Sequence, residues 1–298
     1  MKKRVYKNGA YHHIYQNSIN GYLIFYSIRD ILVFFTIVSI YAKRYRITVL
    51  DISIMLDHIH QLVKAPSKQA FDDFVRDYTR DFTICRNEGP IFNTPFGFAA
   101  KVGDKKVRTS IAYLFNNQVE KKLCNYAEES LWNFLAYYHN DHPFSEKIVR
   151  KYASRPLRRA LLEVDRVYNK GLALNYKLLD RITHSLKVEE KRQLTDYIIT
   201  KYNFIDYDTL ISFYGSYDTM LMAIHSNTGS EYDVNEIFTP GSDMVYLKLI
   251  EKAANWLGYP TLKELLSAPL EARTNAQYKL VRRGWATKEQ ARKFLRIP

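Results

Sequence analysis

Residues 46–64 of the chain read RITVLDISIMLDHIHQLVK, a run of β-branched and apolar residues in near alternation. The pattern predicts one half-buried strand, or two strands with a bend near Leu56 and Asp57. Residues two positions apart on a strand point to the same face, so His58 and His60 are expected to present their imidazoles side by side. Two adjacent imidazoles suit a metal ion, but two half-exposed structural histidines have the same spacing.

The segments around this strand predict a small α+β domain. Residues 10–28 are rich in aromatic and β-branched residues, and Asn20-Gly21 indicates a tight turn within them. His12 and His13 are strand neighbours that point to opposite faces, so they form no comparable pair. Helices are expected over three further ranges: 29–45, 68–86 with Ser67 as its N-cap, and 108–123. Residues 1–125 therefore predict an antiparallel sheet with helices.

The remainder of the chain predicts an all-α region. Residues 126–240 are expected to form a helical scaffold, with a polar loop over 227–241. Residues 241–298 are expected to form a basic helical region that resembles a helix-turn-helix DNA contact, or else an amphipathic helix pair with a solvated basic face. The predicted helices span 128–140, 144–152, 156–170, 174–185, 187–201, 206–214, 217–226, 242–257, 261–268, 273–284 and 287–295.

Charge is the main compositional signal. The 298 residues include 44 Lys and Arg against 31 Asp and Glu, a net charge of +13. Residues 1–130 hold 19 basic and 12 acidic side chains, residues 131–255 hold 16 of each, and residues 256–298 hold 9 and 3. Two basic ends around a neutral middle fit a polyanionic partner, either nucleic acid or anionic lipid, but charge alone equally fits a soluble protein that happens to be basic.

Targeting signals are weak. The basic start, Met1 to Arg4, is not followed by an apolar segment, so secretion is not expected. The apolar stretch 31–42 is shorter than the roughly 20 residues that a membrane-spanning helix needs, so a buried amphipathic helix is expected. Two cysteines, Cys85 and Cys124, form no disulfide framework, which is typical of a reducing cytoplasm.

The helix expected over 108–123 carries a candidate nucleophile. Tyr113 and Asn117 are four residues apart and share one face of that helix. A tyrosine hydroxyl can form a covalent intermediate, and an amide one turn away can complete a metal site. Since the chain has 24 tyrosines, a structural role for Tyr113 has the same local pattern.

In this order, the segments resemble the single-tyrosine HUH transposases, and among them the REP-associated tyrosine transposases. The resemblance covers roughly residues 1–125 and predicts a ferredoxin-like or RRM-like HUH fold. It rests on the following segments: Tyr11-His12-His13-Ile14-Tyr15-Gln16, Asn20-Gly21, Ile24-Phe25, Met55-Leu56-Asp57-His58-Ile59-His60-Gln61-Leu62-Val63, Phe74 to Phe82, Gly89-Pro90-Ile91-Phe92 and Tyr113-Leu114-Phe115-Asn116-Asn117-Gln118-Val119.

The resemblance implies a function and a set of site residues. His58, His60 and Asn117 would hold Mg²⁺ or Mn²⁺, with Gln118 as an alternative ligand. Tyr113 would attack single-stranded DNA beside a hairpin and leave a 5′-phosphotyrosine. Basic residues expected to contact DNA are Lys2, Lys3, Arg4, Lys105, Lys106, Arg108, Arg282, Arg283, Lys288, Arg292 and Lys293. Such an enzyme would act in the cytoplasm, at the nucleoid, with no membrane partner.

Some residues depart from the family's pattern. Asp57 stands where the family has Asn, Leu56 and Gln118 stand where it has Pro, and Gln61 replaces an apolar residue. Alternative hypotheses are a domesticated, non-catalytic binder of hairpin DNA or RNA on the same fold, and a metallohydrolase without a covalent intermediate. The DNA sequence recognised, the metal, and the choice between monomer and homodimer stay open.

Overall fold

The computed structural model describes residues 5–226 and 242–298. Its centre is a four-stranded antiparallel sheet of order β2-β3-β1-β4. The strands are β1 (Tyr11–Asn17), β2 (Thr48–Ile54), β3 (His58–Lys64) and β4 (Gly97–Lys101). The predicted α+β class is confirmed, and the order β1-α1-β2-β3-α2-β4 around this sheet is ferredoxin-like.

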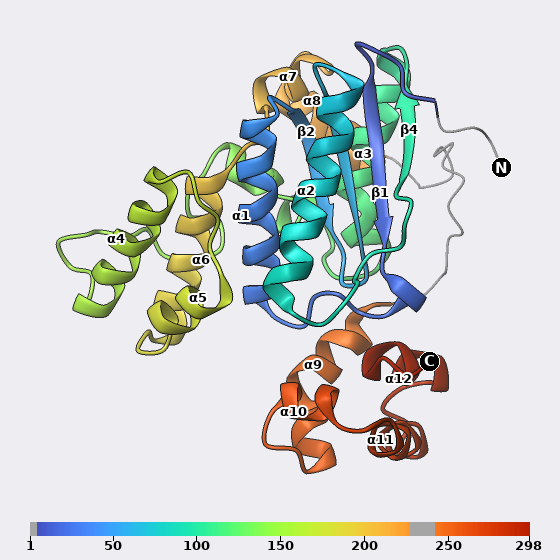
Figure 1. Cartoon of the computed structure of the whole chain (residues 1–298). Helices are drawn as coiled ribbons and strands as arrows, with labels where there is room; N and C mark the ends of the chain where they lie inside the picture. The colour runs from blue at the N-terminus through green and yellow to red at the C-terminus, as the bar shows by residue number, and fades with distance from the viewer. Residues whose placement is uncertain (1–4, 227–241) are drawn as a thin grey trace.

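Helices cover both faces of the sheet (Figure 1). Helices α1 (Ile28–Arg44) and α2 (Lys68–Arg86) lie on one face, and α3 (Asp104–Glu120) lies on the other. Side chains of β3 alternate between the two faces of the sheet. Ile59 and Gln61 point toward α1 and α2, whereas His58 and His60 point toward α3. The sheet therefore has one largely apolar face and one face that carries polar groups.

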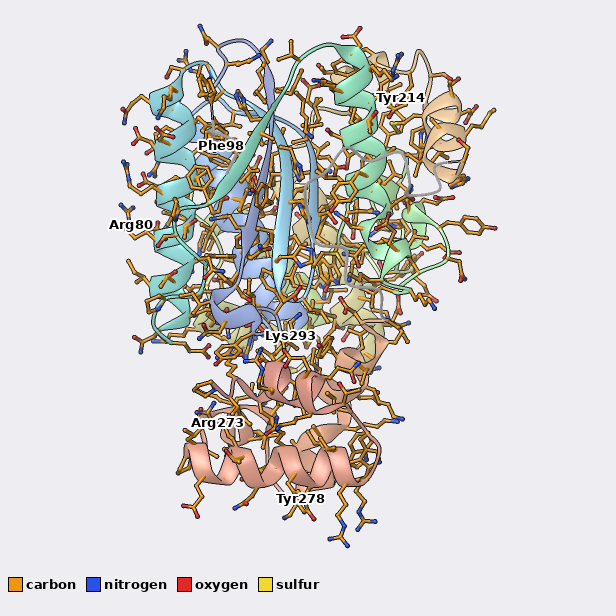
Figure 2. All side chains as sticks on the ribbon, turned by 90° about the vertical axis from the view of Figure 1, so that its right-hand side faces the viewer. Arg80, Phe98, Tyr214, Arg273, Tyr278 and Lys293 are labelled. Carbon is orange, nitrogen blue, oxygen red and sulfur yellow. The ribbon has the colours of Figure 1, made fainter. Side chains whose placement is uncertain are left out.

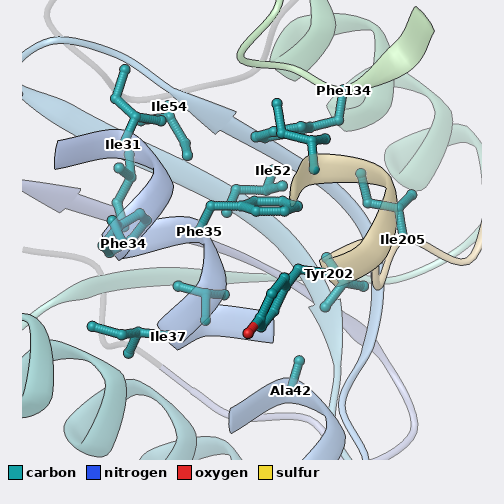
Figure 3. Close-up of a cluster of buried hydrophobic side chains, with 14 of the residues drawn as sticks. Ile31, Phe34, Phe35, Ile37, Ala42, Ile52, Ile54, Phe134, Tyr202 and Ile205 are labelled. Carbon is teal, nitrogen blue, oxygen red and sulfur yellow. The ribbon is translucent and has the colours of Figure 1, made fainter. Parts of the chain in front are cut away.

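Helix α1 contains the apolar stretch 31–42 and is buried along nearly its whole length. On one side Phe34 packs against aromatic rings of α2. On another side Phe35 stacks on Phe134 with ring centroids 4.4 Å apart (Figure 3), and Ser39, one turn further along the same face, donates a hydrogen bond of 2.6 Å to the carbonyl of Tyr202. The helix therefore lies between two layers, which explains why burial extends around it and is not confined to the single stripe of an amphipathic helix. In the described ranges, every helix is too short or too polar to cross a bilayer.

The rest of the described chain is helical, as predicted. After α3, helices α4 to α6 lie beside α1, α7 and α8 lie at the upper end of the sheet, and α9 to α12 lie below it (Figure 1). The helices are α4 (Arg155–Asn169), α5 (Tyr176–Thr183), α6 (Val188–Tyr202), α7 (Tyr207–Ser212), α8 (Tyr217–Ser226), α9 (Met244–Leu257), α10 (Leu262–Ser267), α11 (Leu270–Arg282) and α12 (Lys288–Leu295). The loop predicted over 227–241 lies outside the described residues.

Two predicted helices are wrong. The range 128–140 contains short 3-10 helices at Ala127–Glu129 and Leu135–Tyr138, separated by Phe134 with a φ of 64°. The side chain of Asn133 bonds backbone groups there and so competes with helix formation. The range 144–152 forms no helix, because carboxylates of α6 accept the backbone N–H groups of Phe144 and Glu146.

The strand β4 has no counterpart among the elements predicted from the sequence. Gly97–Lys101 pairs with β1 and forms an edge of the sheet. Small residues weaken its strand signal, but Gly97 is required, because a Cβ at this position would lie 2.0 Å from the ring of Tyr15. The third predicted helix also begins at Asp104 rather than at 108.

Candidate active site

The two histidines of β3 lie side by side. His58 is opposite Asn17 and His60 is opposite Tyr15 in the pairing of β3 with β1. Their imidazole centroids are 4.9 Å apart and the ring planes meet at 84°. His60 is buried, whereas His58 is partly exposed. Alternation along one strand therefore places both imidazoles on the face that α3 covers, as the sequence predicts.

Tyr113 lies beside this pair. Its ring centroid is 5.6 Å from that of His60, and the two rings meet at 80°. The tyrosine comes from the middle of α3, which packs across β2 and β3, and it is partly buried. Tyr113 therefore lies at the same site as the two histidines of β3.

A third histidine, His13 on β1, joins the cluster. Its Nε2 lies 2.9 Å from Nδ1 of His60, and its ring centroid is 5.9 Å from that of Tyr113. Burial lowers the pKa of His13 to about 3, and the charge of Lys101 acts in the same direction. Burial, followed by the neighbouring His58 and His13, also lowers the pKa of His60 well below its usual value. Both rings are therefore neutral near pH 7, and one donates to the other.

His58 is held from its other side by a carboxylate. Its Nδ1 lies 2.5 Å from Oδ1 of Asp57, and Oδ2 of Asp57 forms an ion pair with Nζ of Lys293 on α12. Burial alone would raise the pKa of Asp57, but His58 and Lys293 hold it below its usual range. A carboxylate that accepts from Nδ1 leaves Nε2 of His58 as the ligating nitrogen.

The two candidate amides on α3 differ in their contacts. Gln118 is buried, and its Nε2 donates a hydrogen bond of 2.8 Å to the carbonyl of Ile54 on β2. Asn117 is 6% exposed, and its buried Nδ2 has no hydrogen-bond partner among the described residues. Asn117 is one turn from Tyr113, so the two side chains share one face of α3. The neighbouring Asn116 donates to the carbonyl of Ile224.

The donor groups fit a divalent cation. Neutral imidazoles are good metal ligands, and a carboxylate that accepts from the other ring nitrogen fixes the orientation of the ligating imidazole. Among residues 5–226 and 242–298, no group of three or more His, Cys, Asp or Glu is arranged to hold a metal ion. An amide oxygen, water or substrate oxygen would therefore complete the coordination of His58 and His60.

The predicted DNA-contacting residues lie in separate places. Lys105, Lys106 and Arg108 are exposed at the start of α3, and Arg108 also donates to the carbonyl of Phe213 at 3.5 Å. The others are at the C-terminal end of the chain: Arg282, Arg283, Lys288, Arg292 and Lys293. Lys2, Lys3 and Arg4 lie outside the described residues.

Two of these C-terminal basic residues form contacts within the protein. Lys293 reaches from α12 toward the end of the sheet and pairs with Asp57 (Figure 2). Arg292 forms an ion pair with Glu289 of the same helix. The structure thus makes Lys293 a part of the histidine site rather than an unpaired surface cation.

Sequence reasoning missed the contributions of His13 and Lys293 to this site. His12 and His13 do point to opposite faces, and His12 stacks on Tyr6 with centroids 4.4 Å apart. His13 nevertheless reaches the site, because β1 is the neighbour of β3 and pairs His13 with Leu62, two residues from His60. Knowledge of the strand order would have predicted that His13 lies near His60. No local pattern connects Lys293 with Asp57.

No curated protein matches the chain. The solved structure described as "Structure of the REP associates tyrosine transposase bound to a REP hairpin" aligns with a TM-score of 0.41 and 16% identity, over 47% of this chain and 84% of that one. The family model "Transposase IS200 like" matches residues 10–89, which include β1 to β3 and the histidine pair but not Tyr113. The predicted relationship to transposases is therefore confirmed over residues 10–89, which match the IS200-like transposase family.

Proposed function

We propose that the chain is a metal-dependent transposase and nickase of single-stranded DNA, in which Tyr113 is the nucleophile. The observation that carries the proposal is the position of Tyr113, whose ring is 5.6 Å from that of His60 on the face shared with His58. The match of residues 10–89 to the transposase family supports the same activity class.

The proposed reaction is a transesterification. The hydroxyl oxygen of Tyr113 attacks a DNA phosphorus, and the bond from that phosphorus to the 3′ oxygen breaks. The tyrosine loses its proton to water, the leaving 3′ oxygen gains one, and the products are a 5′-phosphotyrosine and a free 3′ hydroxyl. Attack by a 3′ hydroxyl on the phosphotyrosine reverses these changes, so strands are rejoined without a nucleotide cofactor.

Chain residues position this reaction. His58 and His60 would hold Mg²⁺ or Mn²⁺ together with Asn117, or with Gln118 in its place. When bound, such an ion polarises a phosphoryl oxygen and offsets developing negative charge. His13 and Asp57 orient the two imidazoles through their ring nitrogens. The basic side chains at the start of α3 would attract the DNA backbone.

A covalent-adduct assay tests the proposal. The protein is mixed with Mn²⁺ and a pool of 3′-labelled hairpin oligonucleotides that have randomised single-stranded flanks. We expect a labelled protein band on a denaturing gel, and we expect Tyr113→Phe to abolish it. Tyr152→Phe is the matched control, because this side chain is 80% exposed and outside the site.

Three results separate the proposal from its alternatives. An adduct that survives Tyr113→Phe would exclude this residue as the nucleophile. Cleavage without an adduct would indicate a metallohydrolase. Salt-sensitive hairpin binding without metal dependence or cleavage would indicate a non-catalytic binder of DNA or RNA.

A further inference from the structure

The C-terminal helices contain a pocket that the candidate active site does not use. The pocket has a volume of about 860 Å³ and lies between the end of α9, α11 and the turn after α11. Tyr278 projects from the side of α11 remote from the sheet, whereas Lys293 faces the sheet (Figure 2). The pocket and the histidine cluster are therefore separate sites.

Two stacked indoles form the wall of the pocket. The rings of Trp256 and Trp285 have centroids 4.2 Å apart and are inclined by 24°. The C-terminal end of α11 positions Trp285. Gly284 takes a φ of 67° there, and the N–H of Trp285 donates a hydrogen bond of 3.0 Å to the carbonyl of Leu280. Both rings are only partly buried, so aromatic surface remains accessible.

Cations surround this aromatic surface. Lys279, Arg282 and Arg283 line the pocket and are exposed. Within the described ranges, none of the three forms an ion pair with a carboxylate, in contrast to Arg292 and Lys293 on the next helix. Among residues 5–226 and 242–298, no acidic residue lines the pocket. The arrangement therefore keeps an uncompensated positive charge beside flat apolar rings.

Two more residues suit a nucleotide in particular. Tyr278 is 64% exposed and offers a second aromatic ring, and Asn275 offers an amide that can both donate and accept. A base stacks on aromatic rings irrespective of its sequence, while its phosphates favour arginine and lysine. A paired duplex exposes no base face for such stacking. An inorganic anion alone would not use the indoles.

We infer that this pocket binds an unpaired nucleotide of single-stranded DNA, apart from the site of strand cleavage. The inference rests on the proposed function only for the identity of the ligand as DNA. The pocket would be a second binding site for the single strand and would keep the substrate bound while the tyrosine reacts.

Binding and cross-linking of a short oligothymidine that contains 5-iodouracil test the inference in the full chain. We expect photo-cross-links to Tyr278, Trp256 or Trp285, and weaker binding of a duplex of equal length. Tyr278→Ala should weaken oligonucleotide binding by roughly 5- to 100-fold, the range expected for loss of one stacked base. Replacement of Arg282 and Arg283 by Gln should also make the plot of the logarithm of the binding constant against the logarithm of salt concentration less steep. Its slope should change by about 0.7 for each lost phosphate contact.

The control is the paired substitution Arg158→Gln and Arg159→Gln on α4, two neighbouring exposed arginines outside the pocket. The inference is overturned if these variants and the pocket variants bind alike, if cross-links map elsewhere, or if anionic vesicles bind and the oligonucleotide does not. Tyr113→Phe separates this test from the proposed function, because it should abolish the adduct and leave the pocket cross-links intact. A wild-type chain that forms no adduct but cross-links at the pocket would contradict only the proposed function.

Discussion

At the scale of single residues, the site depends on groups that orient the two imidazoles of β3. His13 contacts His60, and Asp57 contacts His58. Asp57 departs from the asparagine of the resembling family, and the structure supplies a reason for the carboxylate. It is held between His58 and the ammonium of Lys293, so its charge has a partner.

Removal of the Lys293 charge should weaken the proposed metal binding. In Lys293→Met the apolar stem is kept, but Asp57 loses its counter-ion and holds His58 less firmly. We expect Mn²⁺ affinity, measured by titration calorimetry, to fall about 10- to 100-fold, the range typical when a group that orients a ligating histidine is lost. Lys288→Met is the control, since Lys288 is exposed on the same helix. Equal losses in both variants would contradict a specific role for Lys293.

A buried acid should make stability depend on pH. Asp51 is fully buried on β2, its two carboxyl oxygens have no hydrogen-bond partner among the described residues, and burial raises its pKa well above the usual value. Above the ordinary pKa, the unfolded chain loses this proton and the folded chain keeps it. The free energy of unfolding therefore falls as pH rises toward the folded pKa, by about 1.4 kcal/mol per pH unit from this group.

The variant Asp51→Asn removes this titration. We expect its melting temperature, relative to that of the wild type, to increase between pH 4 and pH 7. Exposed Asp141→Asn should show no such trend. A difference between Asp51→Asn and wild type that stays constant with pH would show that Asp51 does not titrate on unfolding.

At the scale of elements, local chemistry sets where helices begin. Helix α2 starts at Lys68, as predicted, because Oγ of Ser67 accepts a hydrogen bond of 3.1 Å from the N–H of Ala70. The helix ends where Asn87 takes a φ of 53°. In contrast, the failed helix prediction for 144–152 shows that carboxylates from a distant helix can take over backbone donors.

The cap of α2 is open to a direct test. Ser67→Ala should lower the free energy of unfolding by about 1 kcal/mol, because an N–H at the helix start loses its acceptor. Urea denaturation measures this change. Ser67→Asp keeps an acceptor and should restore most of the loss. Equal stability of Ser67→Ala and the wild type would show that the cap contributes nothing measurable.

At the scale of the whole molecule, the C-terminal helices are docked on the end of the sheet (Figure 1). Leu23, Tyr26 and Leu56 belong to the same apolar cluster as residues of α9 to α12. The hydroxyl of Tyr26 donates to the carbonyl of Phe294 at 2.7 Å, and Arg296 pairs with Glu88. The same interface contains the ion pair of Asp57, so docking and the histidine site are linked.

Loss of one buried contact should loosen this docking. Tyr26→Phe leaves the carbonyl of Phe294 without its donor, and we expect a cost of about 1 kcal/mol. Hydrogen exchange followed by mass spectrometry should show faster exchange in peptides of α12. Tyr278→Phe, on the exposed side of α11, should leave this exchange unchanged. Unaltered protection of α12 in Tyr26→Phe would refute the proposed importance of the contact.

The sequence by itself determined the features that depend on near neighbours. Alternation places His58 and His60 on one face of a strand, and the side chain of Ser67 begins a helix. The apolar stretch 31–42 predicts a buried helix, and α1 is buried there. Each of these features follows from backbone periodicity or from a hydrogen bond between residues a few positions apart. A short segment of sequence is therefore enough to predict it.

Only the tertiary structure decided which distant residues meet at the site. The order of the strands places His13 against His60, and the path of the last helix places Lys293 against Asp57. Tyr113 was a candidate by resemblance, but its distance to the histidines depends on how α3 packs across the sheet. Such contacts are selected by the packing of the whole core, so no local pattern in the sequence specifies them.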